Sequence, residues 1–140
     1  MSKDPRPVAS SLNALRTMQA NRSTSRLEER FRKSLWRLGL RYRVRNRLPG
    51  RPDIVFSSAK VAVFVHGCFW HGCTHCSLPS PKANREFWAE KLAENQRRDA
   101  NAERTLTAQG WRVVVIWECD VRADLDQAAG TVQAVLRATQ

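Results

Sequence analysis

The chain has 140 residues, of which 42% are hydrophobic, so it is long enough to bury one core without disulfide cross-links. Its formal net charge is +11. No apolar run is long enough to span a membrane, and residues 1–16 lack the apolar core of a signal peptide. We therefore expect a cytoplasmic protein whose thiols stay reduced.

The positive charge is concentrated in the first third of the chain. Residues 1–51 carry 14 Lys and Arg but only 3 acidic residues, whereas residues 52–140 carry 10 of each. Most of these cations are arginines, whose planar guanidinium matches phosphate oxygens, and Trp36 and Tyr42 are interleaved with them. A solvated basic face and a membrane-surface helix are the alternatives, but the segment lacks a broad apolar face for lipid. The charge pattern favours a nucleic-acid partner.

The N-terminal pattern predicts a tail followed by a helix. We expect residues 1–20 to form a basic tail that contacts DNA, with a short helix over 12–21, and residues 21–140 to form a single domain. Within residues 22–40, Leu27, Phe31, Leu35 and Leu38 recur at spacings of four, four and three residues, which predicts an amphipathic helix. Gly39 is a natural end for that helix.

The rest of the chain alternates between strand and helix patterns. Four strands and two further helices are expected, in the order strands 41–46, 54–56 and 60–66, helix 84–108, strand 111–118 and helix 124–139. Turns are predicted at 47–53 and 57–58, and a Cys/His loop follows residue 66. This order predicts an α/β fold in which helices flank a mixed central sheet.

The stretch "VHGCFWHGCTHC", residues 65–76, contains all three histidines and three of the four cysteines. Cys119 is the fourth and is expected at the end of the last strand. Four thiolates suit a structural zinc site, because a closed tetrahedral shell leaves no open position for catalysis. His75 competes with Cys76 for the third ligand position. The alternative is that Cys119 is a buried core thiol and the other cysteines bind nothing.

Three other residues are candidates for chemistry. His66 and His71 flank Cys68, and such a position suits proton transfer or phosphate contact. Asp53 precedes a buried strand, where metal-dependent nucleases commonly hold Mg²⁺. However, the stretch "VAVFVH" of the next strand has neither the acid nor the lysine expected there, so the spacing favours a turn or cap residue over a metal ligand.

Four stretches taken together resemble a known family. In order they are "LPGRPDIVF", "VFVHGCFWHGC", "EFWAEKLAENQRRD" and "GWRVVVIWEC". They look like the very short patch repair (Vsr) family of DNA mismatch endonucleases, from about residue 18 to 119. The resemblance implies the fold of the restriction-endonuclease (PD-(D/E)xK) superfamily with a structural zinc site. It also implies Mg²⁺-dependent nicking 5′ to the T of a T:G mismatch, which arises when 5-methylcytosine deaminates.

The same resemblance implies roles for individual residues. Asp53 matches the Mg²⁺-binding aspartate, and the backbone carbonyl of Val65 would be a second metal contact. His66 and His71 match the active-site histidines, with His71 as general base or water-holding residue oriented by Asp99. Glu28 matches a glutamate of the first long helix, although Glu29 is adjacent to it.

The remaining implied residues hold zinc or contact the bases. The zinc ligands fall on Cys68, Cys73, Cys76 and Cys119. The aromatic residues that wedge into the DNA stack beside the mismatch match Phe69, Trp70 and Trp88, and ordinary core packing is the alternative for these three.

The resemblance also implies partners, and two other functions remain open. The expected substrate is double-stranded DNA with a mismatch, bound by a monomer that works near the nucleoid and hands its nick to downstream repair proteins. A restriction-type or modified-base endonuclease of the same fold is the first alternative. A non-catalytic, zinc-stabilised DNA-binding module is the second. The bases that flank the target are not specified by these motifs.

Overall fold

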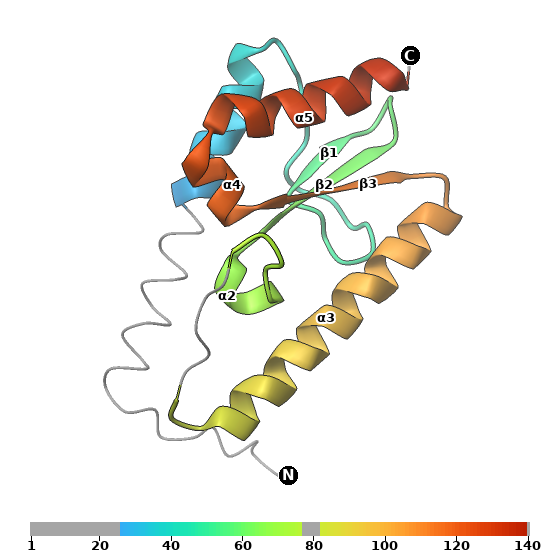
Figure 1. Ribbon diagram of the computed structural model, residues 1–140. Helices are drawn as coiled ribbons and strands as arrows, with labels where there is room; N and C mark the ends of the chain where they lie inside the picture. Colours follow the sequence, from blue (N-terminus) through green and yellow to red (C-terminus); the bar gives the residue numbers. More distant parts are fainter. Residues whose placement is uncertain (1–25, 77–81, 140) are drawn as a thin grey trace.

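A small β-sheet with helices on both sides forms the centre of the protein (Figure 1). The computed structural model describes residues 26–76 and 82–139, so the expected tail and the short helix over 12–21 lie outside the described residues. Residues 26–37 are helical and are called the N-terminal helix below. The elements that follow are β1 (Ile54–Phe56), β2 (Val61–His66), α2 (Cys68–His71), α3 (Arg85–Ala108), β3 (Arg112–Trp117), α4 (Glu118–Ala123) and α5 (Leu125–Ala138).

The sheet has the order β1-β2-β3 and is mixed, as predicted. Strand β1 pairs with β2 in antiparallel fashion, and β2 pairs with β3 in parallel. Val63 at the middle of β2 lies opposite Ile54 on one side and Val114 on the other. Because β2 and β3 are parallel, their carboxyl ends meet at one edge of the sheet. His66 and Trp117 are paired at that edge.

The larger core lies between the sheet and the pair formed by the N-terminal helix and α5. Leu27, Phe31 and Leu35 are at most 5% exposed, so their spacing does mark the buried face of this helix. Leu38, predicted for the same face, is 43% exposed because the helix ends at residue 37. Val61, Val63 and Val65 project to the same side of the sheet, because alternate strand residues face opposite ways. Full burial of each such side chain contributes about 1.5–3 kcal/mol to stability.

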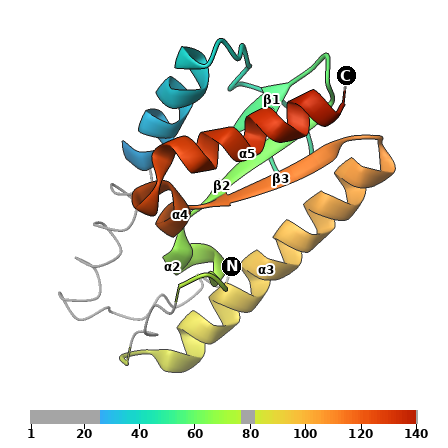
Figure 2. The same ribbon diagram turned by 45° about the horizontal axis from the view of Figure 1, so that its top comes forward.

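The opposite face of the sheet is covered mainly by α3, and Leu48 packs against the same cluster. Ala62 and Phe64 pack there against Ala102 and Leu106. With 24 residues α3 is about 36 Å long, whereas the six residues of β3 span about 20 Å. The first half of α3 therefore extends past the sheet and runs beside α2 (Figures 1 and 2). No helix among the described residues is long and apolar enough to cross a membrane.

The strand predicted over residues 41–46 does not form. One isolated bridge, between Arg43 and Val55, is the only ladder contact that the described chain makes there. The side chain of Asn46 donates to the Pro52 carbonyl and accepts from the Leu48 amide, so it replaces backbone pairing. Pro52 also lacks the N–H that a longer ladder would need.

Two further predictions need correction at the ends of β2 and β3. The chain turns into α4 directly after Trp117, so Cys119 lies on a short helix and not on the last strand. The predicted Cys/His loop begins with a single helical turn, α2. Strand β3 is less buried than expected, because its side chains alternate between buried and part-exposed positions. The predicted helices 84–108 and 124–139 are confirmed as α3 and α5.

Candidate active site and thiol cluster

Asp53 occupies the end of the sheet where β2 finishes. It immediately precedes β1, and its Oδ2 accepts a hydrogen bond of 2.7 Å from the backbone amide of Val65. Burial raises the pKa of the Asp53 carboxyl to about 6, and the nearby carboxylate of Glu28 adds to the shift. A cation bound beside Asp53 would stabilise the ionised form of this buried carboxyl.

Glu28 reaches toward the same place from the N-terminal helix. Its carboxylate forms an ion pair of 2.9 Å with Arg32, and burial raises its pKa. Glu29 is more exposed and pairs with Lys33 at 3.3 Å on the solvent side. The structure thus separates the two adjacent acids, and Glu28 is the one that lies near Asp53.

His66, His71 and Asp99 gather on the α3 side of the sheet. His66 ends β2 and is 7% exposed, whereas His71 ends α2. The two imidazole rings stack with centroids 3.9 Å apart and planes within 5°. Nδ1 of His71 lies 2.6 Å from Oδ2 of Asp99 on α3. With Nδ1 held by the carboxylate, Nε2 of His71 is the nitrogen left to accept a proton.

The stacked rings are better suited to proton transfer than to holding one metal between them. Their ligand atoms and that of Asp99 lie within 4.8 Å of one another, close enough for a metal site by distance alone. However, a metal binds in the plane of an imidazole, and two parallel planes share no point. Burial and the neighbouring His71 lower the pKa of His66 to about 4, so His66 is neutral near pH 7.

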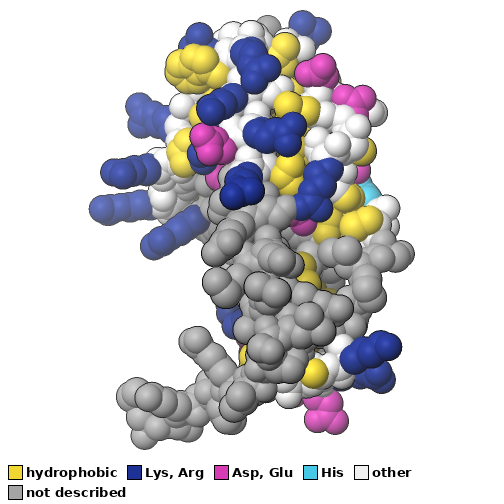
Figure 3. All heavy atoms as spheres, turned by 90° about the vertical axis from the view of Figure 1, so that its left-hand side faces the viewer, with side chains coloured by type: hydrophobic (Ala, Val, Ile, Leu, Met, Phe, Trp, Pro, Cys, Tyr) yellow, Lys and Arg dark blue, Asp and Glu magenta, His cyan; other side chains and the backbone are white. Residues whose placement is uncertain are grey.

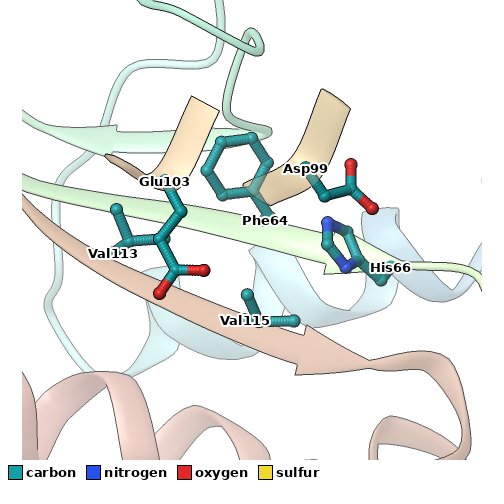
Figure 4. Close-up of a pocket in the computed structure, with 6 residues that line it drawn as sticks. All are labelled: Phe64, His66, Asp99, Glu103, Val113 and Val115. Carbon is teal, nitrogen blue, oxygen red and sulfur yellow. The ribbon is translucent and has the colours of Figure 1, made fainter. Parts of the chain in front are cut away.

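A shallow pocket opens beside this pair. It is lined by residues of β2, β3 and α3, namely Phe64, His66, Asp99, Glu103, Val113 and Val115. Figure 4 shows Asp99 beside the His66 ring, with the Glu103 carboxylate one helical turn farther along the pocket. Glu103 had no signal in the sequence beyond its four-residue spacing from Asp99.

The four cysteines form a second cluster on the other side of α2. The Sγ atoms of Cys68, Cys73, Cys76 and Cys119 all lie within 4.8 Å of one another, and the described chain contains no disulfide. Four thiolates bound to zinc at about 2.3 Å would place their sulfurs about 3.8 Å apart. Cys73 Sγ lies 3.6 Å from Cys119 Sγ, so the donor set and its spacing fit zinc.

His75 is occupied elsewhere. Its Nδ1 lies 2.6 Å from Oδ2 of Asp120, and its backbone amide donates to Cys73 Sγ at 3.2 Å. The sequence left His75 and Cys76 as alternatives for one ligand position. Cys76 Sγ lies with the other three sulfurs, whereas the ring of His75 is paired with Asp120.

Glu118 connects α4 to the start of α2 and was missed in the sequence. Its side chain is 5% exposed, and its Oε1 accepts a 3.2 Å hydrogen bond from the backbone amide of Cys68. Its Oε2 accepts from Arg122 at 3.3 Å. The available signal was an acidic residue that ends an apolar strand pattern, directly before Cys119.

Phe69, Trp70 and Trp88 pack against one another where α2 meets α3. Their ring centroids are 4.8–6.1 Å apart, and all three are part-exposed outside the two core clusters. The indole Nε1 atoms of Trp70 and Trp88 are buried without a hydrogen-bond partner in the described part of the chain. Two unpaired indole donors are unusual for ordinary core packing.

Gly72 allows α2 to approach α3 this closely. Its φ of +65° lies in the left-handed region, and a Cβ there would come within 2.6 Å of Nε2 of Gln96. Asn95, on the same part of α3, donates to the Trp70 carbonyl at 2.9 Å. These contacts fix the turn that presents both His71 and the aromatic residues.

Comparison with known proteins identifies the class. Residues 12–78 match the Vsr family, described as DNA mismatch endonuclease Vsr. The type II nicking enzyme V.XorIIP of Xanthomonas oryzae pv. oryzae is 43% identical over 122 residues, covering 85% of each chain. The DNA mismatch endonuclease Vsr of Escherichia coli (strain K12) is 44% identical over 105 residues, covering 74% of this chain and 66% of that protein. The type II nicking enzyme V.NmeDIP of Neisseria meningitidis is 40% identical over 126 residues, covering 88% and 85%.

These relatives define the chain as a DNA endonuclease, a hydrolase of phosphodiester bonds. It belongs to the Vsr family. The resemblance stated from the sequence motifs is thereby confirmed, together with the α/β fold class and DNA as the substrate.

Proposed function

We propose that this protein nicks one DNA strand 5′ to the T of a T:G mismatch, in a Mg²⁺-dependent reaction that starts short-patch repair. One observation carries the proposal: two sets of reactive groups meet at the carboxyl end of β2. Asp53 is bonded to the Val65 amide, and His66 is the next residue along the strand. Successive strand residues face opposite ways, so the carboxylate set and the histidine set flank one point at this end of the sheet.

Asp53 and Glu28 fit a Mg²⁺ ion, since hard cations take carboxylate oxygens and the burial that raises the Asp53 pKa is relieved by a nearby cation. Oδ2 of Asp53 is engaged with Val65, which orients the carboxylate. When bound, Mg²⁺ supplies stabilisation of the charge that develops on the phosphate. The Val65 carbonyl is proposed as a further contact of the Mg²⁺ ion. We also propose a restriction-endonuclease-like fold, which the mixed sheet with a carboxylate at this strand end supports.

His71 is proposed as the general base. Asp99 holds Nδ1–H at 2.6 Å, so Nε2 can take the proton of the attacking water, and the carboxylate stabilises the imidazolium that results. His66 supports the ring by stacking and stays neutral, which avoids two adjacent positive charges.

The thiol cluster is proposed to hold a structural Zn²⁺. A closed set of four thiolates leaves no position for substrate, so its role would be to fix α2 against α4. His71 and the aromatic residues extend from α2 and its surroundings. Loss of this zinc is therefore expected to affect the active site indirectly.

Phe69, Trp70 and Trp88 are proposed to insert beside the mismatch. Their part-exposed cluster, with two buried indole donors unpaired, is consistent with side chains that complete their contacts on DNA. Wedging costs a few kcal/mol of base stacking, and a weakly paired T:G step lowers that cost.

The deciding test compares end-labelled duplexes that differ at one base pair. T:G, T:A and C:G duplexes would be incubated with and without Mg²⁺, using the wild type and the Asp53→Ala and His71→Ala variants. We expect a Mg²⁺-dependent nick on the T strand of the T:G duplex alone, with DNA binding retained and nicking lost in both variants.

Other outcomes separate the alternatives. Cleavage of all three duplexes would indicate a restriction-type or modified-base nuclease of the same fold. Binding without any cleavage, over several flanking sequences, would indicate a non-catalytic module. Nicking that is unchanged in Asp53→Ala would reject the proposed metal site.

A further inference from the structure

The segment over residues 41–47 runs beside the chain that carries Asp53. Arg43 exchanges backbone hydrogen bonds with Val55, at 2.9 and 2.8 Å. The Asn46 side chain then bonds the Pro52 carbonyl at 2.9 Å. Both contacts correspond to the same antiparallel register, in which position 45 lies opposite Asp53. The segment therefore leads directly to the candidate metal site.

Alternate side chains of this segment face inward and outward. Tyr42 faces inward, where its hydroxyl donates to the Arg32 carbonyl at 3.0 Å and its ring packs on Phe56. Asn46 is also part-buried. The exposed residues between and beside them are the arginines at positions 41, 43, 45 and 47 and also Val44, which departs from the alternation and is 42% exposed.

Arg41 has a structural role that sets it apart from the other three. Its guanidinium stacks on the ring of Trp36 at 3.7 Å and donates to the Trp36 carbonyl at 2.9 Å. It thus caps the end of the N-terminal helix. Arg43, Arg45 and Arg47, called the arginine rail here, have no carboxylate within ion-pair distance in the described part of the chain.

The arginine rail has the charge and spacing of a phosphate-binding surface. The three arginines are spaced two residues apart in the chain, so three like charges follow one another without a neighbouring carboxylate. Figure 3 shows Lys and Arg gathered on the upper part of one face of the protein, with few acidic side chains between them. A guanidinium binds phosphate through two N–H groups, and each contact releases counterions from DNA.

We propose that Arg43, Arg45 and Arg47 bind successive phosphates of the DNA strand that enters the Asp53 site. The arginine rail supplies affinity that is independent of sequence, and it does not distinguish a mismatch from a matched pair. Its placement on the cut strand rests on the proposed endonuclease function. Its contact with the DNA backbone can be tested without any cleavage.

The test measures DNA binding as a function of salt. Affinities of the wild type and of a triple Arg→Gln variant at positions 43, 45 and 47 would be measured by fluorescence anisotropy on T:A and T:G duplexes, in NaCl series without Mg²⁺. For three lost phosphate contacts, the slope of log K against log [NaCl] should fall in magnitude by about 2.7. Affinity should fall by the same factor on both duplexes.

Two control variants show whether a change in slope is specific to the arginine rail. A triple Arg→Gln change at Arg104 on α3, Arg112 at the start of β3 and Arg137 near the end of α5 removes the same charge from other elements, and its slope should change by less than about 1. A triple Arg→Lys change on the arginine rail should keep the slope, because the charge is kept. Circular dichroism would check that each variant is folded.

Two results would overturn the proposal. One is an equal slope change in the arginine rail and control variants. The other is a loss of affinity for the T:G duplex alone, which would make these arginines mismatch readers. If the wild type nicks no mismatch but the arginine rail variant still shows the reduced slope, the proposed function is rejected and the arginine rail is supported.

Discussion

Glu118 and Cys68, 50 residues apart in the chain, are joined by a buried hydrogen bond of 3.2 Å from the Cys68 amide to the Glu118 carboxylate. Cys68 begins α2 and Glu118 begins α4. The bond therefore ties the turn that bears His71 to the helix that bears Cys119. It holds the thiol cluster and the histidine pair in one frame.

Loss of this acceptor should destabilise the protein. In Glu118→Ala the Cys68 amide is left buried without its partner, which costs about 1–3 kcal/mol. Glu118→Gln keeps one carbonyl oxygen and should lose less. Urea unfolding of both variants gives the comparison. Equal stability of wild type and Glu118→Ala would contradict the role assigned to the bond.

The proposed zinc site predicts different effects on zinc content for substitutions at the neighbouring residues Cys76 and His75. Cys76→Ser should lose most of the bound zinc, because one of four ligands is removed. His75→Ala should keep it, since His75 bonds to Asp120 instead. Metal analysis of the purified variants provides the measurement. Zinc lost in His75→Ala and kept in Cys76→Ser would reverse the ligand assignment.

The sequence predicted elements correctly where burial leaves a clear pattern of apolar residues. The four-residue spacing of Leu27, Phe31 and Leu35 located the N-terminal helix, and the apolar run 61–66 located β2. It failed at 41–46, where alternation reflects arginines that face solvent and not a buried sheet face. Side-chain bonds of Asn46 then replaced the ladder.

For the candidate site, sequence motifs named the residues but not their contacts. That Asp99 would reach Nδ1 of His71 across 28 residues could be inferred only from the family resemblance. Glu103 and Glu118 were missed because the spacing of Glu103 from Asp99 and the position of Glu118 before Cys119 do not reveal the pocket and the tertiary contact that these residues form. The pairing of His75 with Asp120, which bears on the proposed choice between His75 and Cys76, could not be read from the sequence.

Asp53, the proposed Mg²⁺ ligand, is expected to lower the free energy of unfolding at neutral pH when no cation is bound. Its folded-state pKa of about 6 lies above the ordinary value of 3.8, so the ionised form costs about 3 kcal/mol when no cation is bound. Without Mg²⁺, Asp53→Asn should be more stable than wild type by up to that amount at pH 8. The difference should shrink as pH falls below about 6 and vanish below 3.8.

Denaturant unfolding over a pH series would measure this difference, with Mg²⁺ omitted throughout. Glu29→Gln, at a more exposed acid whose ion pair faces solvent, is the control and should show little change. A difference between Asp53→Asn and wild type that is constant from pH 4 to pH 8 would contradict the burial of the carboxylate.

The aromatic cluster should affect mismatch recognition more than fold. Trp88→Phe keeps a ring in contact with Phe69 but shortens the wedge, so the preference for T:G over T:A duplexes should fall by about tenfold. Trp36→Phe, at a tryptophan that is 49% exposed on the N-terminal helix, should leave that preference unchanged. Binding titrations on the two duplexes test both. An unchanged preference in Trp88→Phe would indicate that Trp88 only packs in the protein and does not insert beside the mismatch.

Asp99 provides the most direct test of the proposed base. In Asp99→Asn the amide can donate to Nδ1 of His71, which moves the ring proton to Nε2 and removes the base. We expect kcat to fall by about 10²-fold or more, with DNA affinity retained. Glu103→Gln is the matched control, since this acid lines the same pocket one turn along α3. If both variants lose activity equally, the loss reflects charge near the pocket. If neither does, His71 is not oriented by Asp99 during the reaction.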